Sequence, residues 1–200
     1  MKKFLHVGCG HKKKSSTTNG FNTEGWPEFR YDIDESVKPD YVGSMTDIGV
    51  ISSGSFDAVF SSHNIEHLYA HEVPVALSEF HRILNDQGVA VLTCPDLKSV
   101  CELVAQDKLT EQAYLSPAGP ITPLDILYGH RESMKKGNLY MSHKCGFTQK
   151  VLVASIQSVG FVSVVSKSRG APYFDLWAVA TKDERSEHDL RQLSIAHFPS

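Results

Sequence analysis

The chain has 200 residues, which is enough for one domain of ordinary size with a substantial buried core. With 41% hydrophobic residues, 22% charged residues and a formal net charge of -3, it lacks the basic excess that general binding to nucleic acid or acidic membranes requires. No apolar run is long enough to span a bilayer, and the apolar stretch of MKKFLHVGCG stops at Gly8, too early for a signal peptide. We therefore expect a cytoplasmic protein whose four cysteines, none of them in a C-x-x-C pair, are reduced thiols.

The first half of the chain alternates short apolar strands with polar loops. KFLHV is a buried strand that ends at the tight turn GCG, and a long polar loop follows it. Alternating or apolar runs then predict three further strands before a helix, which has Pro74 in its first turn. The predicted elements are strands at 3–7, 29–34, 40–43 and 55–62 and a helix at 71–84.

The second half continues this alternation but contains one irregular segment. NDQG predicts a turn, and the Pro-rich segment 109–142 is too long for a simple connection. Thr148 and Gly160 are typical of the start and end of a helix, and Ser186 with Asp189 begins a short terminal helix. The predicted elements are a turn at 85–88, strands at 89–95, 161–167 and 174–182, and helices at 97–106, 148–160 and 186–193.

This order of elements predicts an α/β fold, with a mostly parallel sheet and helices on both faces, in a single domain over 1–200. The last two strands are too close in sequence for a helical crossover, so they must be antiparallel. In such a sheet a ligand binds at the carboxyl ends of the strands, where the strand order reverses. The residues at those ends are Gly8 to Gly10, Asp32, Asp34, Ser61 to His63 and Cys94 to Asp96.

Two of these strand ends have chemistry suited to a nucleoside. Gly8 and Gly10 let a ligand approach the backbone closely, although an ordinary strand-to-loop turn would use the same residues. The full G-x-G-x-x-G fingerprint is absent, because position 13 is a lysine. Asp32 or Asp34, about two dozen residues after the glycines, could accept both hydroxyls of a ribose.

Five ordered segments resemble the motifs of class I S-adenosylmethionine-dependent methyltransferases: FLHVGCG, RYDIDESVKPDYVGSMTD, SFDAVFSSHNIEHL, FHRILNDQGVAVLTCPDL and HKCGFT. The similarity is greatest to a small branch with H-x-x-E-H-L after the fourth strand, and it covers residues 3–100 and 143–180. It implies a Rossmann-like fold, a seven-stranded sheet with an antiparallel last strand, and S-adenosyl-L-methionine as cofactor. The implied reaction moves a methyl group to an oxygen or nitrogen nucleophile of a small or medium acceptor.

The resemblance also assigns roles to individual residues. It places Gly8, Cys9 and Gly10 at the methionine part of the cofactor. It places Asp32 at the ribose, with Asp34 as the alternate, and it places Ser44 and Met45 at the adenine. The residues beside the transferable methyl are Ser61, Ser62 and His63.

Two positions depart from the family pattern. His6 stands where the first motif has an acid, and Ser44 stands where an acid contacts the adenine, with Asp47 close enough in sequence to compensate. These departures motivate an alternative function, in which the chain is a cofactor-binding partner subunit that transfers no methyl group itself.

The acceptor side is expected between the fourth strand and the irregular segment. His63 follows that strand directly, so we expect it to act as a base or to orient the acceptor, with His143 as the second candidate. Segment 109–142 is predicted to be a lid that closes over the acceptor. Its side chains expected to contact the acceptor, which could equally be surface loop residues, are Tyr128, His130, Arg131, Tyr140 and, just after it, His143.

The stretch HNIEH, residues 63–67, matches the H-x-x-E-H pattern of a family of zinc hydrolases. Such a site needs a third protein ligand, and His71, His81, His130 and His143 all lack metal-type spacing. We therefore predict that HNIEH binds no metal and that Glu66 and His67 stabilise the turn through hydrogen bonds to backbone groups. A zinc hydrolase remains the third and least favoured alternative.

Overall fold

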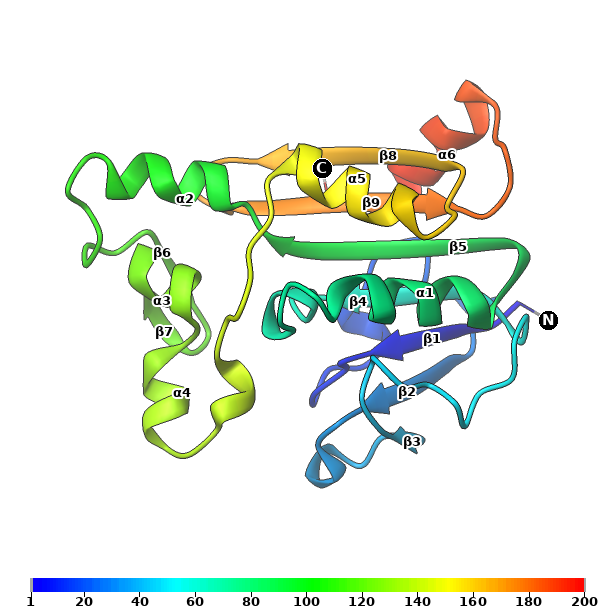
Figure 1. The fold of residues 1–200 in the computed structure, drawn as a ribbon, viewed down its shortest axis with the longest axis horizontal. Coiled ribbons are helices and arrows are strands. Elements are labelled where there is room, and N and C mark those ends of the chain that lie inside the picture. The colour runs from blue at the N-terminus through cyan, green and yellow to red at the C-terminus, as the bar shows by residue number, and fades with distance from the viewer. Residues whose placement is uncertain (1, 200) are drawn as a thin grey trace.

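A computed structural model describes residues 2–199, and its centre is one seven-stranded sheet (Figure 1). The strand order is β3-β2-β1-β4-β5-β9-β8, and β9 runs opposite to the other six strands. The predicted Rossmann-like sheet with an antiparallel last strand is therefore confirmed. The strands are β1 (Phe4–Val7), β2 (Glu28–Asp32), β3 (Tyr41–Val42), β4 (Phe56–Ser62), β5 (Leu84–Pro95), β8 (Ser163–Arg169) and β9 (Asp175–Thr181).

Strand β1 lies at the point where the strand order reverses. After β1 the chain adds β2 and β3 on one side of it, and β4 and β5 then follow on the other side. All four residues of β1 are buried, because layers of side chains cover both faces of the sheet there. A ligand crevice is expected between the carboxyl ends of β1 and β4.

Helices cover both faces of the sheet (Figure 1). Helices α1 (Val73–Ile83) and α5 (Gln149–Ser158) lie on one face, and α6 (Glu187–His197) lies on the other with the long loop that follows β1. The buried residues of α1 recur at the helical spacing that the sequence predicts, and Thr148 caps α5 by accepting a hydrogen bond from the Val151 amide. No helix among residues 2–199 is long and apolar enough to cross a membrane.

The predicted turn at NDQG is wrong. Residues 84–95 form the single strand β5, and the register against β4 shifts between Phe56 and Ala58, so NDQG becomes a bulge inside the strand. The Asn85 side chain accepts a hydrogen bond from the Gln87 amide and stabilises this bulge locally. Turn-forming residues therefore mark an irregularity here without ending the strand.

The segment 109–142 is more regular than its sequence indicates. It contains a hairpin of β6 (Tyr114–Ser116) and β7 (Gly119–Ile121), then α3 (Pro123–Tyr128) and α4 (Arg131–Lys135). It lies beyond the carboxyl ends of the central strands, next to α2 (Leu97–Val104) (Figure 1). Four short 3-10 turns complete the described chain, at Lys14–Ser16, Glu35–Val37, Ile65–His67 and Leu139–Met141.

This segment, which we call the lid, has its own small apolar cluster. Ile121 and Ile126 of the lid pack with Val100 of α2 and with Phe174, and all four are buried. The cluster attaches the lid to the end of the sheet. Whether the lid closes over an acceptor stays a prediction.

His197, at the end of α6, joins the last helix to the long loop after β1. It is 6% exposed, and its Nδ1 lies 2.7 Å from the Thr18 hydroxyl oxygen. The centroids of the His197 and Phe21 rings are 4.4 Å apart. Gly20 leaves room for it, since a Cβ there would lie 2.6 Å from the imidazole. Burial lowers the pKa of His197 from 6.5 to about 4.

This buried imidazole predicts that the protein loses stability in weak acid. An unfolded histidine takes up a proton below its ordinary pKa of 6.5, but native His197 stays neutral until the pH approaches its pKa of about 4, so acid favours the unfolded state. The loss between pH 8 and pH 5 is about 2 kcal/mol from this residue. Urea unfolding at both pH values measures this loss of free energy of unfolding. The variant His197→Gln should lose about 2 kcal/mol less than the natural protein between pH 8 and pH 5. Equal pH dependence in both proteins would contradict the assignment.

Candidate functional site

The two glycines after β1 have different roles in the structure. Gly8 and Gly10 both have positive φ, +64° and +51°. A Cβ on Gly8 would overlap the side chain of Asn64, which donates three hydrogen bonds to groups at the ends of β1 and β4. A Cβ on Gly10 would meet no heavy atom within 4 Å. Gly8 thus admits Asn64, and Gly10 is the position where a ligand can approach the backbone.

Asp32, at the end of β2, lies beside Gly10. Its carboxylate accepts hydrogen bonds from the Gly10 amide at 2.7 Å and from the Asp34 amide at 2.9 Å, and the residue is 8% exposed. Asp34 faces the next turn, where its carboxylate accepts from the Ser36 amide. The Ser36 side chain, and after it this amide, hold the pKa of Asp34 below its ordinary value. Of the two candidate acids, Asp32 is the one that contacts the glycine turn.

Arg30 is a residue that the sequence-based prediction missed. It is 5% exposed, and its guanidinium donates to the backbone oxygens of Gly10, Val37 and Lys38. One buried cation therefore holds the glycine turn against the loop after β2. The available signal was a charged residue in the middle of a predicted strand, on the same face as Glu28 and Asp32.

Glu28 resolves the first departure from the family pattern. The Nδ1 of His6 donates to Glu28 Oε1 at 2.7 Å, and the Lys14 amide donates to Glu28 Oε2 at 2.9 Å. Burial lowers the pKa of His6, with Glu28 acting in the opposite direction. A carboxylate from the neighbouring strand thus orders the loop after β1 in place of the missing acid.

The residues predicted for the adenine follow β3. The Ser44 hydroxyl lies 2.7 Å from that of Thr46, and the Tyr31 hydroxyl donates to the backbone oxygens of Ser44 and Asp47. The Asp47 carboxylate accepts from the Gly49 amide, and Met45 packs against the main core. These contacts order the turn after β3 on the same edge of the sheet as Gly10 and Asp32.

A cavity of about 340 Å³ lies between the ends of β4 and β5 and the lid. Two of the five predicted acceptor residues, His130 and His143, line it, whereas Tyr128, Arg131 and Tyr140 do not. Tyr128 and Tyr140 are 61% and 60% exposed, and Arg131 forms an ion pair with Asp125. Residues that line the cavity and were not predicted include Lys12, Tyr114, Tyr173 and Phe174.

His63 enters this cavity from the end of β4. Its backbone has φ +55°, a left-handed conformation that is costly for a residue with a side chain and is frequent at functional sites. Its amide donates to the Thr93 carbonyl, so the pairing of β4 with β5 fixes its position. Its imidazole is 43% exposed, and Nδ1 lies 3.5 Å from Glu66 Oε1. Ser61 and Ser62 bond to Asn64 and Thr93 respectively.

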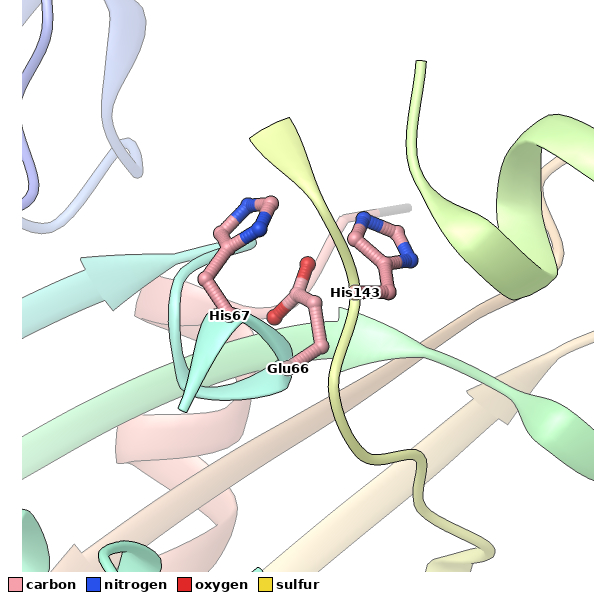
Figure 2. Close-up of side chains that lie close together, drawn as sticks. All are labelled: Glu66, His67 and His143. Atoms are coloured by element: carbon pink, nitrogen blue, oxygen red, sulfur yellow. The ribbon is translucent and has the colours of Figure 1, made fainter. Parts of the chain in front are cut away.

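Glu66, His67 and His143 form a cluster on the cavity wall (Figure 2). One carboxylate oxygen and one ring nitrogen of each histidine lie within 4.8 Å of one another. Glu66 is 1% exposed, and neither of its carboxylate oxygens has a hydrogen-bond partner. Burial raises the pKa of Glu66, but His63, His67 and His143 outweigh it, so the carboxyl stays below its ordinary pKa.

Two expectations about HNIEH are wrong. The Glu66 carboxylate forms no hydrogen bond to a backbone group of the described residues, and its Oε1 instead lies 3.5 Å from Nδ1 of His63. A third potential ligand is present, because His143 returns from the far side of the lid to lie beside His67, with ring centroids 4.8 Å apart. The expectation for His67 is confirmed, as its Nδ1 lies 3.0 Å from the Ser142 carbonyl oxygen.

The comparison with known proteins agrees with this geometry. Residues 5–92 match the family described as "Methyltransferase domain". This match covers β1 to most of β5, the part of the chain that carries the glycine turn, Asp32 and His63, and this part is similar to a methyltransferase domain. No curated protein matches the sequence.

Solved methyltransferase structures share the fold at low sequence identity. A SAM-dependent methyltransferase from Archaeoglobus fulgidus is 15% identical, with a TM-score of 0.57 over 90% of this chain and 86% of that one. One from Methanosarcina mazei is 14% identical, with a TM-score of 0.61 over 92% and 93% of the two chains. The Burkholderia thailandensis 1,6-didemethyltoxoflavin-N1-methyltransferase, with bound 1,6-didemethyltoxoflavin and S-adenosylhomocysteine, is 13% identical, with a TM-score of 0.58 over 91% and 71%.

The contact between Gly8 and Asn64 predicts a strong energetic coupling. Gly8→Ala should destabilise the protein by about 1–2 kcal/mol from the left-handed backbone, and by more from overlap with Asn64. In Gly8→Ala/Asn64→Ala the overlap disappears. The double variant should therefore lose less free energy of unfolding than the sum of the losses in the two single variants. Urea unfolding of the four proteins measures this, with an expected coupling energy of about 0.5–3 kcal/mol. Simple additivity would mean that Gly8 is not there to admit Asn64.

Proposed function

We propose that this protein transfers a methyl group from S-adenosylmethionine to an oxygen or nitrogen atom of a small or medium acceptor bound in the 340 Å³ cavity. The observation that carries the proposal is the position of that cavity. Lys12, which follows the glycine turn, and His63, at the end of β4, both line it, so it adjoins the crevice at the ends of β1 and β2. A donor in the crevice and an acceptor in the cavity would meet beside His63.

The crevice suits the cofactor in its donor set. Gly10 leaves open space against the backbone, and the carboxylate of Asp32 beside it retains lone pairs for the two hydroxyls of a ribose. Ser44 and Met45 would contact the adenine, while Cys9, Gly10, Ser61, Ser62 and His63 would contact the methionine part. The bound cofactor supplies an activated methyl group on its sulfonium sulfur. The chain has to hold the acceptor atom in line with that methyl group, which accounts for much of the catalysis in such reactions.

His63 is the residue best placed to receive a proton from the acceptor. Glu66 Oε1, 3.5 Å from its Nδ1, favours the tautomer with the proton on Nδ1 and leaves the lone pair of Nε2 available. A neutral imidazole is a suitable base near neutral pH. His143 is less suited to this role, because its Nδ1 is bonded to the Ile126 carbonyl oxygen and burial lowers its pKa.

The acceptor is expected to be a small molecule with both polar and apolar parts. Tyr114, Tyr173 and Phe174 line the cavity together with His130 and Lys12, so flat or apolar groups and polar groups both find partners. The net charge of -3 is consistent with an acceptor that is not nucleic acid. A cofactor-binding partner subunit without its own activity remains the second candidate, since Ser44 presents no charge to the adenine.

The proposal is tested by cofactor binding followed by methyl transfer. Calorimetry with S-adenosylhomocysteine should give a dissociation constant of about 1 μM to 1 mM, the range usual for enzyme substrates. Transfer of labelled methyl from S-adenosylmethionine is then screened over small hydroxyl and amine acceptors. Binding with no transfer to any acceptor class would favour the partner subunit, and no binding would overturn both readings.

Asp32 should carry most of the charged contact with the cofactor. Asp32→Ala is expected to weaken S-adenosylhomocysteine binding at least tenfold, because a charge-assisted hydrogen bond contributes about 1.5–3 kcal/mol. Calorimetry on the purified variant measures this, and a thermal melt checks the fold, since Asp32 also accepts two backbone hydrogen bonds. Asp34→Ala is the matched control and should bind almost as the natural protein does. The reverse result would move the ribose contact to Asp34.

His63→Asn should lower kcat about a hundredfold or more, the usual effect of removing a general base. Asparagine tolerates the left-handed backbone at this position, so the variant removes the imidazole with little added strain. The affinity for S-adenosylhomocysteine should change little, and added imidazole should restore part of the rate. An unchanged kcat would assign His63 to packing against the cofactor.

A further inference from the structure

The cluster of Glu66, His67 and His143 has the composition of a metal site. Glu66 and His67 come from the 3-10 turn after β4, and His143 comes from the segment that leaves the lid, so two distant parts of the chain converge (Figure 2). One donor atom from each lies within 4.8 Å of the others. A single ion placed among them would therefore reach all three with small side-chain adjustments.

The unpartnered carboxylate is the observation that points to a ligand. Both oxygens of Glu66 are buried and bond to no described group. An ionised carboxylate in that state costs several kcal/mol unless a positive charge compensates it, and His63 approaches only one of its oxygens, at 3.5 Å. A bound cation would compensate this charge.

The hydrogen bonds of the two histidines orient them as ligands. His67 Nδ1 lies 3.0 Å from the Ser142 carbonyl oxygen, and His143 Nδ1 lies 2.8 Å from that of Ile126. A carbonyl oxygen only accepts, so Nδ1 carries the proton in both rings and Nε2 keeps its lone pair. Backbone carbonyls that fix a histidine in this way are the usual outer partners of metal-ligating imidazoles.

We propose that Glu66, His67 and His143 bind one divalent transition-metal ion on the wall of the acceptor cavity. Two imidazole nitrogens and one carboxylate oxygen favour Zn²⁺, Co²⁺, Ni²⁺ or Fe²⁺ over Mg²⁺ and Ca²⁺, which prefer oxygen ligands. Three protein ligands leave coordination positions open, as in catalytic sites, and here the open side faces the cavity.

The ion also narrows the acceptor class. An acceptor hydroxyl that reaches an open position would lose its proton more easily, with His63 at hand to take it, so the site favours oxygen over nitrogen acceptors. This refinement rests on the proposed methyl transfer, whereas the metal site does not. It also replaces the prediction of a metal-free HNIEH, whose premise was that no third ligand exists.

The test is metal binding by the full-length protein after chelator treatment and dialysis. We expect titration with ZnCl₂ to give about one equivalent by calorimetry and by elemental analysis, and bound Co²⁺ to show the visible absorption of a low-symmetry nitrogen and oxygen site. Glu66→Gln, His67→Gln and His143→Gln should each weaken binding at least tenfold, because each removes one of three ligands. His71→Gln is the matched control, since His71 is exposed, lies four residues from His67 and does not line the cavity.

Two results would overturn the site: less than a tenth of an equivalent of metal in the natural protein, or full binding retained in the cluster variants. A thermal melt of each variant checks the fold, and three separate ligands keep the test decisive if one variant is unstable. S-adenosylhomocysteine binding is measured in parallel without metal. If the natural protein binds metal but not S-adenosylhomocysteine, the proposed function alone is refuted. If it binds S-adenosylhomocysteine but not metal, the metal site alone is refuted.

Discussion

Parallel pairing of β1 with β2 on one side and with β4 on the other is the constraint on which the site depends. Val7 lies opposite Tyr31 in β2 and opposite Ser61 in β4, so the turn after β1 begins level with the ends of both neighbours. The strands share one direction, and their polar ends therefore meet at one edge. A shift of either pairing by one residue would turn the buried side chains of that strand to the opposite face, and the core on both faces opposes such a shift.

The edge is stiffened by polar side chains that bond to backbone groups. Arg30, Glu28 and Asn64 each bond to the end of β1 or to the turn and loop that follow it. They satisfy backbone groups that loops would otherwise leave unpaired. Glu66 lies a few residues beyond Asn64 and lacks such partners. Arg30, Glu28 and Asn64 therefore stabilise the backbone around the crevice, whereas the charge of Glu66 is available to a ligand.

The lid contributes the side of the cavity that faces the ends of β4 and β5. Its apolar cluster with Val100 and Phe174 fixes it at the ends of β5 and β9, and the chain leaves it through His143 to reach α5. The backbone amides of Lys144 and Cys145 both donate to the Glu66 carbonyl oxygen, so the exit segment is tied directly to the turn after β4. The cavity and the cluster on its wall therefore depend on one attachment between segments far apart in the sequence.

The sheet and its polar edge could be predicted from the sequence alone. The period of the apolar residues, the capping residues of α5 and α6, and the short link between β8 and β9 depend on local geometry, so they can be predicted without contacts. The sequence also placed Gly10, Asp32 and His63 at strand ends. The turn assigned to NDQG failed because a bulge inside a strand uses the same residues as a turn.

Which polar groups contact one another could not be predicted from the sequence. That Gly8 faces Asn64, that Glu28 replaces the acid expected at His6, and that His143 joins Glu66 and His67 all depend on contacts across many intervening residues. Sequence spacing carries no information about such contacts when a lid with its own packing lies between them. The burial that leaves the Glu66 carboxylate without a partner is likewise a property of the packed chain, since the same residue in an isolated turn would be bonded to water.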